Sequence, residues 1–393
     1  MSKSNYVIRI LDSVLQLEPA SWNELLAQQE HPTPFMRHEY LGALESSGCA
    51  TPQTGWSPRF LTLSSHEGQL QAACPLYIKS HSRGEYVFDW SWAGAYERHG
   101  LPYYPKGVVA VPFTPVSGSR LLARDAVARQ ALLDVMLDLS RHAGLSSLHL
   151  LFGMPQDMAA ARRAGMMPRH DVQFHWRNSA SGYIDFDAFL ADLNQEKRKK
   201  IRQERRKVEQ AGVSFRTRLG RDITQQDWDF FFRCYERTYL EHGQAPYLNR
   251  EFFAQMAKQL PEHWLLFVAQ RGGADIAASL IAVTASSEQA PRLAWGRYWG
   301  ALERVDCLHF EACYYQPLAW CITHGYHRFE GGAQGEHKLA RALLPSRTDS
   351  AHWLENPDFS NAVGEYLARE VPGVDAYLQA LSLHSPMKKA GGT

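Results

Sequence analysis

Both halves of the chain repeat one order of predicted elements, and this order limits the fold more than any other feature. In each half, hydrophobic patterns predict helices, a β-hairpin, a strand with a polar end, a helix and a final strand. With 393 residues, the chain exceeds what one hydrophobic core usually supports. We predict an α/β (α+β) protein with tandem domains at 1–178 and 179–393, each a mixed central sheet flanked by helices.

The composition is that of a globular protein with no strong charge. Hydrophobic residues make up 45% of the chain, and the formal net charge is +1 at pH 7. This balance argues against a general polyanion binder and against a disordered acidic chain. The six cysteines include no CxxC pair, which favours reduced thiols over a disulfide framework or a zinc site. The histidines form no metal signature, so we predict no metal.

The sequence gives no sign of secretion or of membrane insertion. Its first residues lack the charged start and apolar core of a signal peptide. No run of about 18 apolar residues suggests a membrane-spanning helix. We therefore expect a cytoplasmic protein without an integral membrane segment. The motifs HExxH, GxSxG and GxGxxG and the P-loop are also missing, which argues against metalloproteases, serine hydrolases, dinucleotide enzymes and NTPases.

The loop GGAQGEHK, followed closely by Arg341, holds the densest set of reactive side chains. Its glycines permit backbone conformations closed to other residues and let a ligand approach the main chain. Acyl transfer to an amine needs a base to accept the ammonium proton, and either Glu336 or His337 has the required chemistry. The predicted substrate- or anion-binding residues of this segment are Gln334, Lys338 and Arg341. The alternative is a solvated, charged loop.

The preceding run, 308–324, is predicted to be a helix that carries Glu311, a third catalytic candidate. On a helix, Glu311 shares a face with Tyr314 and Tyr315, so either pair is a candidate buried hydrogen-bonded unit. Pro317 lacks a backbone N–H and is expected to kink this helix or to start a new one.

In the first half, the segment VPFTPVSGSR is a candidate anion site. Small side chains near a helix start offer free N–H groups to a phosphate, and an arginine adds a fixed cation. The residues predicted to bind the anion are Ser117, Gly118 and Arg120. A proline-stiffened turn with serine N-caps is the alternative interpretation.

The segment GEYVFDWSWA is predicted to be a strand, with its aromatic side chains on one face and Glu85, Asp89 and other residues on the opposite face. The aromatic face is expected to be core. The acidic face, with Lys106 and nearby tyrosines, is a candidate groove for a sugar or peptide acceptor.

A continuous helix is predicted over 186–212, at the start of the second half. Its segment 196–210 has eight basic residues against three acidic ones. A basic helix can follow an RNA backbone or an anionic membrane surface. A solvated face with i, i+4 ion pairs explains the same pattern equally well.

Seven phrases together resemble a bacterial Fem-like family, linked to peptidoglycan biosynthesis, within the GNAT (acyl-CoA N-acyltransferase) superfamily. They are GEYVFDWSWA, YYPK, VPFTPVSGSR, SSLHLLF, GRYWG, LHFEACYYQ and FEGGAQGEHKLAR, in this order between residues 35 and 352. The resemblance implies two tandem GNAT-like domains. Fem-type relatives transfer an amino acid from aminoacyl-tRNA to an amine of a cell-wall precursor, and they also have a basic helical stretch at the start of the second domain.

One departure from the GNAT pattern concerns the acyl donor. GNAT enzymes that use acetyl-CoA carry a Q/R-x-x-G-x-G/A loop whose N–H groups hold the pyrophosphate. Neither half of this chain has that spacing, since GRYWGALERV has two glycines at another spacing and TPVSGSRLL has one. No cofactor is therefore predicted with certainty, and the donor is either acyl-CoA or aminoacyl-tRNA.

These observations leave three hypotheses. The first is a transferase that moves an acyl or aminoacyl group to an amine of a small molecule or cell-wall precursor. The second is a non-catalytic protein on the same scaffold that binds a cell-wall precursor or a nucleic acid such as tRNA through 197–207. The third is a CoA-dependent N-acetyltransferase of small amines.

Overall fold

The computed structural model describes residues 6–286, 288, 291–333 and 335–388 of the chain. The chain forms two compact units. The first contains residues up to Asp171 and returns with Arg347–Ala376, and the second contains Val172–Ser346 and the residues from Tyr377 onward. These units are defined by contacts alone, so the predicted domain boundary after residue 178 stays a prediction. None of the helices in the described ranges is long and apolar enough to cross a membrane.

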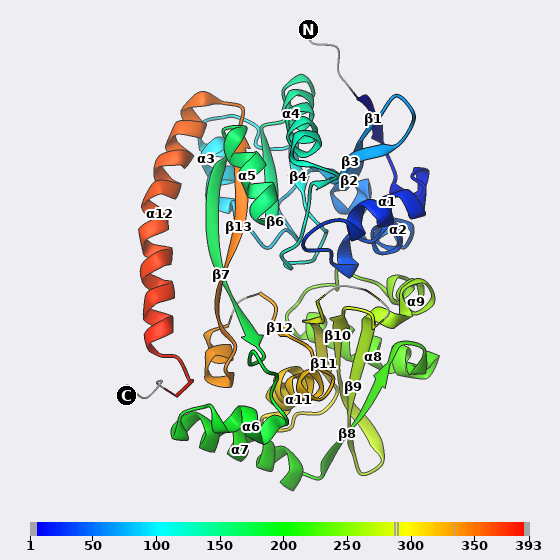
Figure 1. The fold of residues 1–393 in the computed structure, drawn as a ribbon, viewed down its shortest axis with the longest axis vertical. Helices are drawn as coiled ribbons and strands as arrows, with labels where there is room; N and C mark the ends of the chain where they lie inside the picture. The colour runs from blue at the N-terminus through cyan, green and yellow to red at the C-terminus, as the bar shows by residue number, and fades with distance from the viewer. Residues whose placement is uncertain (1–5, 287, 289–290, 334, 389–393) are drawn as a thin grey trace. The chain divides into compact units, whose positions relative to one another are not determined.

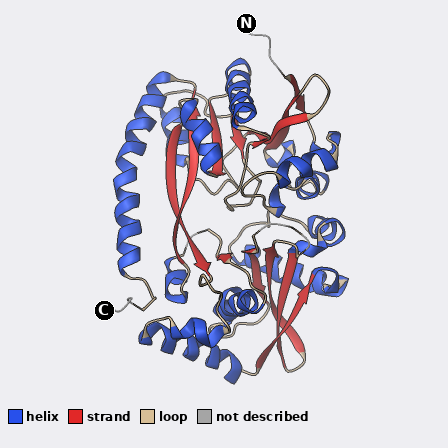
Figure 2. Cartoon of the chain, in the orientation of Figure 1, coloured by secondary structure: helices blue, strands red, loops and turns tan. Residues whose placement is uncertain are grey.

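The first unit is a mixed sheet with helices around it (Figures 1 and 2). Its strands follow the order β1-β2-β3-β4-β6-β13, and only β4 and β6 run parallel. The elements are β1 (Val7–Leu11), α1 (Pro19–Ala27), α2 (His38–Ser46), β2 (Trp56–Ser64), β3 (Leu70–Lys79), α3 (Trp90–Arg98), β4 (Lys106–Val109), β5 (Leu122–Ala123), α4 (Ala126–His142), β6 (Ser147–Gly153), α5 (Pro155–Arg163), β7 (Met167–Arg177), β13 (Leu344–Leu354) and α12 (Pro357–Leu383). Strands β7 and β13 and helix α12 each continue into the second unit.

Helix α4 shows why the sequence folds locally in this way. Asp125 caps its start by accepting a hydrogen bond from the N–H of Ala128 at 2.7 Å. Leu132 and Met136 lie one turn apart on its buried face, and they pack in one core with side chains of β2, β3 and β6. The helix and the sheet therefore share one apolar layer.

The second unit repeats this arrangement with the strand order β7-β12-β11-β10-β9-β8, in which only β11 and β12 run parallel. The elements are α6 (Phe186–Ala191), α7 (Gln195–Gln210), β8 (Val213–Leu219), α8 (Gln225–Glu241), α9 (Arg250–Gln259), β9 (Trp264–Arg271), β10 (Ala274–Val283), β11 (Leu293–Ala301), α10 (Leu308–Phe310), a π-helical segment (Glu311–Tyr315), α11 (Gln316–Thr323), β12 (Arg328–Glu330) and a 3-10 helix (Glu336–Arg341). The mixed sheet and flanking helices of each unit confirm the predicted fold class.

Helices cover both faces of this second sheet. Trp264 of β9 meets Trp228 of α8 edge to face, whereas Leu265, the next residue, packs in a core with Leu318 of α11. Helix α8 also lies directly on β11, because an added Cβ at Gly300 would stand 1.8 Å from the carbonyl oxygen of Cys234. This close approach requires glycine at position 300.

Two local predictions were wrong. The segment 85–89 is not a strand, and Trp90–Arg98 forms helix α3, so the aromatic residues do not share one strand face. The continuous helix predicted over 186–212 is two helices, α6 and α7, separated by three residues and restarted by an Asn194 cap. The helix predicted over 308–324 is confirmed over 308–323, and it contains the π-helical segment. Helix α11 begins next to Pro317, a residue without an N–H for the helical ladder, as expected for a new start.

Candidate active site

The predicted catalytic loop forms a turn and a short helix after strand β12. Gly335 has a φ of +108°, a conformation that L-residues with a side chain rarely adopt, and it leads into the 3-10 helix Glu336–Arg341. Gln334 lies outside the described residues. The helix presents Glu336 and His337 to solvent and buries Lys338. The loop thus separates the exposed acid and imidazole from the buried ammonium group.

His337 pairs with a tyrosine of the π-helical segment. The hydroxyl of Tyr314 lies 3.0 Å from Nε2 of His337. Partial burial of the ring lowers the pKa of His337 from its usual value, and the charges of Lys338 and Arg341 also lower it. The ring is therefore neutral at neutral pH and has one basic nitrogen. Burial also raises the pKa of Tyr314, so that its phenol keeps its proton.

A second neutral imidazole lies next to this pair. The ring of His309 is 5.6 Å from that of Tyr314, 6.2 Å from that of His337 and 5.5 Å from that of Trp299 on β11. Burial, with a smaller effect of neighbouring positive charges, lowers the pKa of His309 to about 4. His309 and, beyond it, Trp299 therefore add aromatic rings beside the pair of Tyr314 and His337.

Lys338 points back into its own loop. Its ammonium group donates hydrogen bonds to the carbonyl oxygens of Gly332 at 2.9 Å and Ala333 at 3.0 Å. Burial lowers the pKa of this side chain to about 8. These contacts hold the glycine turn in place, whereas the role predicted for Lys338 in anion binding stays a prediction.

Arg341 lies in a buried ion pair with Glu204 of helix α7. Its Nη2 is 2.9 Å from both carboxylate oxygens of Glu204, and the hydroxyl of Tyr315 also donates to this carboxylate. Nη1 donates to the carbonyl oxygen of His337 at 2.6 Å, and the guanidinium stacks on Phe310 at 3.4 Å. The pair therefore fixes the backbone of His337 against α7.

The other two catalytic candidates also have partners. Glu311 is buried, and both of its oxygens lie 3.2 Å from Nε of Arg205, while Gln316 donates to it at 2.8 Å. Glu336 is exposed and accepts a hydrogen bond from the hydroxyl of Tyr377 at 2.6 Å. The structure thus brings His337, Lys338 and Arg341 together around one turn and places Glu311 in a separate ion pair.

A cavity of about 530 Å³ opens at that second ion pair. It is lined by Arg205 and Glu311 together with Arg202 and Arg206 of α7, the ring of Phe215 and several further residues of α6, α7 and β8. A neighbouring hollow of about 640 Å³ follows the outer face of α7 and is lined mainly by its basic residues. The basic residues of α7 therefore line two concave surfaces.

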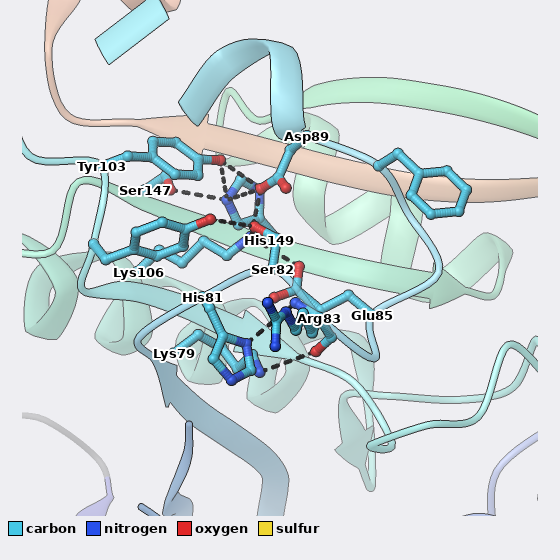
Figure 3. A network of polar contacts seen from close by, with 12 residues as sticks. Lys79, His81, Ser82, Arg83, Glu85, Asp89, Tyr103, Lys106, Ser147 and His149 are labelled. Carbon is cyan, nitrogen blue, oxygen red and sulfur yellow. Dashed lines mark hydrogen bonds and ion pairs between the residues drawn. The ribbon is translucent and has the colours of Figure 1, made fainter. Parts of the chain in front are cut away.

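In the first unit, Lys106 is fully buried in a polar network (Figure 3). Its ammonium group is 2.8 Å from a carboxylate oxygen of Glu85 and is also bonded to Asp89. Asp89 also accepts a hydrogen bond from the hydroxyl of Tyr103 at 2.6 Å. Burial raises the pKa of Glu85 to about 7, against the opposing effect of Lys106. An acceptor-binding role for Lys106 stays a prediction.

In the remaining predicted anion site, the side chain of Arg120 is buried. The buried guanidinium of Arg120 donates to the carbonyl oxygens of Leu151 at 3.1 Å and Gly118 at 3.3 Å, and to that of Val116. Asp157 accepts hydrogen bonds from the backbone N–H groups of Arg120 and Leu121. Ser117 precedes Gly118 in the same turn, and anion binding by Ser117, Gly118 and Arg120 stays a prediction.

Sequence reasoning missed two parts of the site, Glu204 and the Tyr314 contact. Glu204 is the only acid between Lys197 and Lys207. This position was a usable signal, because burial of an arginine requires a counter-charge. The pairing of Tyr314 with His337 depends on the π-helical turn, for which the sequence has no signal beyond Pro317. Among the described residues, no group of three or more metal-ligating side chains lies together.

A family model described as peptidoglycan biosynthesis/recognition, the FemAB-like family, matches residues 13–389. The chain belongs to the FemAB-like family. The match covers nearly all of its length and confirms the resemblance seen in the sequence. No curated protein sequence matches the chain significantly.

Three solved structures share the fold of this FemAB-like protein. FemX is 10% identical with a TM-score of 0.54, and the match covers 91% of this chain and 100% of FemX. The C-terminal domain of a protein named as a lysylphosphatidylglycerol synthetase from Agrobacterium fabrum is 11% identical with a TM-score of 0.53, covering 89% and 96%. L-PGS from Bacillus licheniformis is 11% identical with a TM-score of 0.50, covering 86% and 98%. The family description covers peptidoglycan biosynthesis or recognition, and the three solved structures show the fold alone.

Proposed function

We propose that this FemAB-like protein transfers an acyl or aminoacyl group to an amine of a peptidoglycan precursor. The observation that carries the proposal is the contact between the hydroxyl of Tyr314 and Nε2 of a neutral His337. A neutral imidazole held by a phenol is a base able to accept the proton that an attacking amine loses. Aminoacyl-tRNA and acyl-CoA are the two donor classes that the proposal admits.

In the proposed reaction, the neutral amine of the acceptor attacks the carbonyl carbon of the donor, and a C–N bond forms. The amine proton passes to the hydroxyl oxygen of Tyr314, while the phenolic proton passes to Nε2 of His337. The bond from the carbonyl carbon to the leaving oxygen or sulfur then breaks. The resulting imidazolium returns the proton to this leaving group, so that every atom and charge balances.

The remaining residues of the turn have positioning roles in this proposal. Arg341 holds the carbonyl of His337, and Lys338 holds the carbonyls of Gly332 and Ala333. Both cations also keep His337 unprotonated, because a second positive charge nearby is unfavourable. Glu336 is the alternative base, and its contact with Tyr377 leaves one carboxylate oxygen for an acceptor amine.

The test is transfer of a labelled group from charged tRNA or acyl-CoA to a muramyl peptide that carries a free amine. His337→Ala is expected to lose activity by about 10²–10⁴-fold with the melting temperature unchanged, as is typical for a general base. The acid limb of the wild-type pH–rate profile is expected below the usual histidine pKa of about 6.5. Full activity of His337→Ala, with full loss in Glu336→Ala, would instead assign the base to Glu336.

A second candidate function is recognition of a polyanion without catalysis. The two cavities lined by basic residues of α7 favour it, because they offer several guanidinium groups to one chain of phosphates. Tight binding of tRNA that weakens steeply with salt, with no turnover of any donor, is the outcome that would select this function over transfer.

A further inference from the structure

A separate pocket of about 420 Å³ lies between the end of helix α8 and strand β11 in the second unit. We name it the tyrosine pocket after its main lining residues, Tyr235, Tyr239, Arg297, Tyr298, Trp299 and His242. Its volume is within the range of small-molecule sites, roughly 300–1,000 Å³. The reaction proposed above does not use it.

The walls of the tyrosine pocket are rigidly held aromatic rings. The ring of Tyr235 is 5.0 Å from that of Tyr239 and 5.4 Å from that of Tyr298, both edge to face. Thr238 donates a hydrogen bond to the carbonyl oxygen of Trp299 at 3.0 Å, which ties α8 to β11 at the pocket. Tyr235 and Tyr298 are buried, whereas Tyr239 and Trp299 are partly exposed. The exposed rings provide flat surfaces for a ligand.

The charge of the tyrosine pocket comes from one residue. Arg297 contributes a guanidinium that lies 4.9 Å from the ring of Tyr298 and donates to its hydroxyl at 3.2 Å. Among the described residues that line the pocket, none is acidic. Burial raises the pKa of Tyr235 and Tyr239, so that both phenols stay neutral. Arg297 therefore adds a guanidinium to a lining of neutral phenols.

The imidazole of His242 adds a directed acceptor at the rim. Its Nδ1 lies 2.6 Å from the carbonyl oxygen of Thr238 and must donate there, since a carbonyl only accepts. In its neutral form, the ring then offers Nε2 as a hydrogen-bond acceptor. A hydroxyl-bearing ring fits these groups better than a bare aromatic acid, because it can donate to His242 while its face covers Tyr239 or Trp299.

We propose that the tyrosine pocket binds a small ligand with a hydroxylated ring and one anionic group, the anion on Arg297 and the ring against Tyr239 and Trp299. A planar guanidinium accommodates either a carboxylate or a phosphate in the bidentate manner. Acidic sugars and nucleoside monophosphates share this chemistry. The inference stands apart from the proposed transfer, because binding is measurable without turnover.

The test uses isothermal titration calorimetry of the full chain with D-glucuronate and uridine 5′-monophosphate. D-Glucose and uridine serve as neutral partners of these two probes. We expect at least one anionic probe to bind, and its neutral partner to bind about tenfold more weakly or worse. Binding of only the sugar acid or only the nucleotide identifies the source of the anion. No binding of either anionic probe at millimolar concentration, or equal binding of the neutral partners, overturns the proposal.

Variants assign the binding to the pocket. Arg297→Gln is expected to lower the affinity for the anionic probe by about tenfold or more, and to leave the affinity for uridine or glucose unchanged. Tyr239→Leu is expected to lower the affinity for both the anionic probe and its neutral partner. Arg218→Gln, which removes an exposed guanidinium from β8, is the matched control. Unchanged binding in folded Arg297→Gln or folded Tyr239→Leu would refute the assignment, and His337→Ala is expected to bind normally even when it transfers nothing.

Discussion

Replacement of Lys106 by methionine tests the buried network of the first unit. The side chain of Lys106 is fully buried, and methionine fills a similar volume without a charge. The change leaves Glu85 and Asp89 buried without their cation. Removing one partner of a buried ion pair typically costs about 3–5 kcal/mol of unfolding free energy. For a unit of this size, that loss lowers the melting temperature by roughly 6–20 °C.

The pH dependence of this variant gives a second, independent readout. Without Lys106, the pKa of each carboxyl group in the folded protein rises, because burial is no longer opposed by the cation. A carboxyl whose folded pKa is raised stabilises the protein fully below its unfolded pKa and loses this contribution as the pH rises. The deficit of Lys106→Met is therefore expected to be larger at pH 8 than at pH 5.

Thermal unfolding followed by circular dichroism at both pH values measures these effects. Arg162→Met is the matched control, since it removes an exposed cation from α5 in the same unit. The double variant Lys106→Met/Asp89→Asn should recover part of the lost stability, because it removes one of the stranded charges. A difference of about 3 °C in melting temperature corresponds to roughly 1 kcal/mol of unfolding free energy. If Lys106→Met melts within about 3 °C of wild type at pH 8, the reasoning is refuted.

Three further predictions concern stability. Arg341→Met should lower the free energy of unfolding by about 3–5 kcal/mol, because it strands the buried carboxylate of Glu204; chemical denaturation measures this loss. Burial lowers the pKa of Lys79 from 10.5 to about 7, so between these pH values the unfolded chain binds a proton that the folded protein does not, and the stability of the fold rises with pH. Lys79→Met should abolish this rise, which is measured as the melting temperature at each pH. An unchanged rise in the variant would contradict the prediction. Gly300→Ala should cost about 1–3 kcal/mol or more, because the new methyl group meets the carbonyl of Cys234; wild-type stability would show that α8 moves away freely.

The architecture was predictable because hydrophobic periodicity and turn residues mark most of the strands and helices. The β-hairpin predicted in the second half, for example, is formed by β9 and β10, with Gly272 and Gly273 at its turn. Helix α12 and strand β13 were not predicted. The segment 85–89 was wrongly predicted as a strand, because its alternating aromatic residues match a β pattern. In the structure, these residues belong to a loop that leads into the start of helix α3.

The candidate site was predictable only in part, for a related reason. Residue type and glycine content pointed to the turn that carries His337, and those signals are local. The partners of each charge are set by tertiary contacts, so that Arg341 faces Glu204 across 137 positions of the chain. A sequence shows which groups are reactive, whereas the folded packing decides which of them are neutralised, buried or left accessible.

The return of Arg347–Ala376 to the first unit has a consequence for biosynthesis. Strand β13 completes the order of the first sheet beside β6, yet the ribosome makes it only after nearly the whole second unit. The edge of β6 therefore has no native neighbour on that side during most of translation. A nascent chain halted before residue 347 should show slow amide exchange in the second unit and rapid exchange along β6.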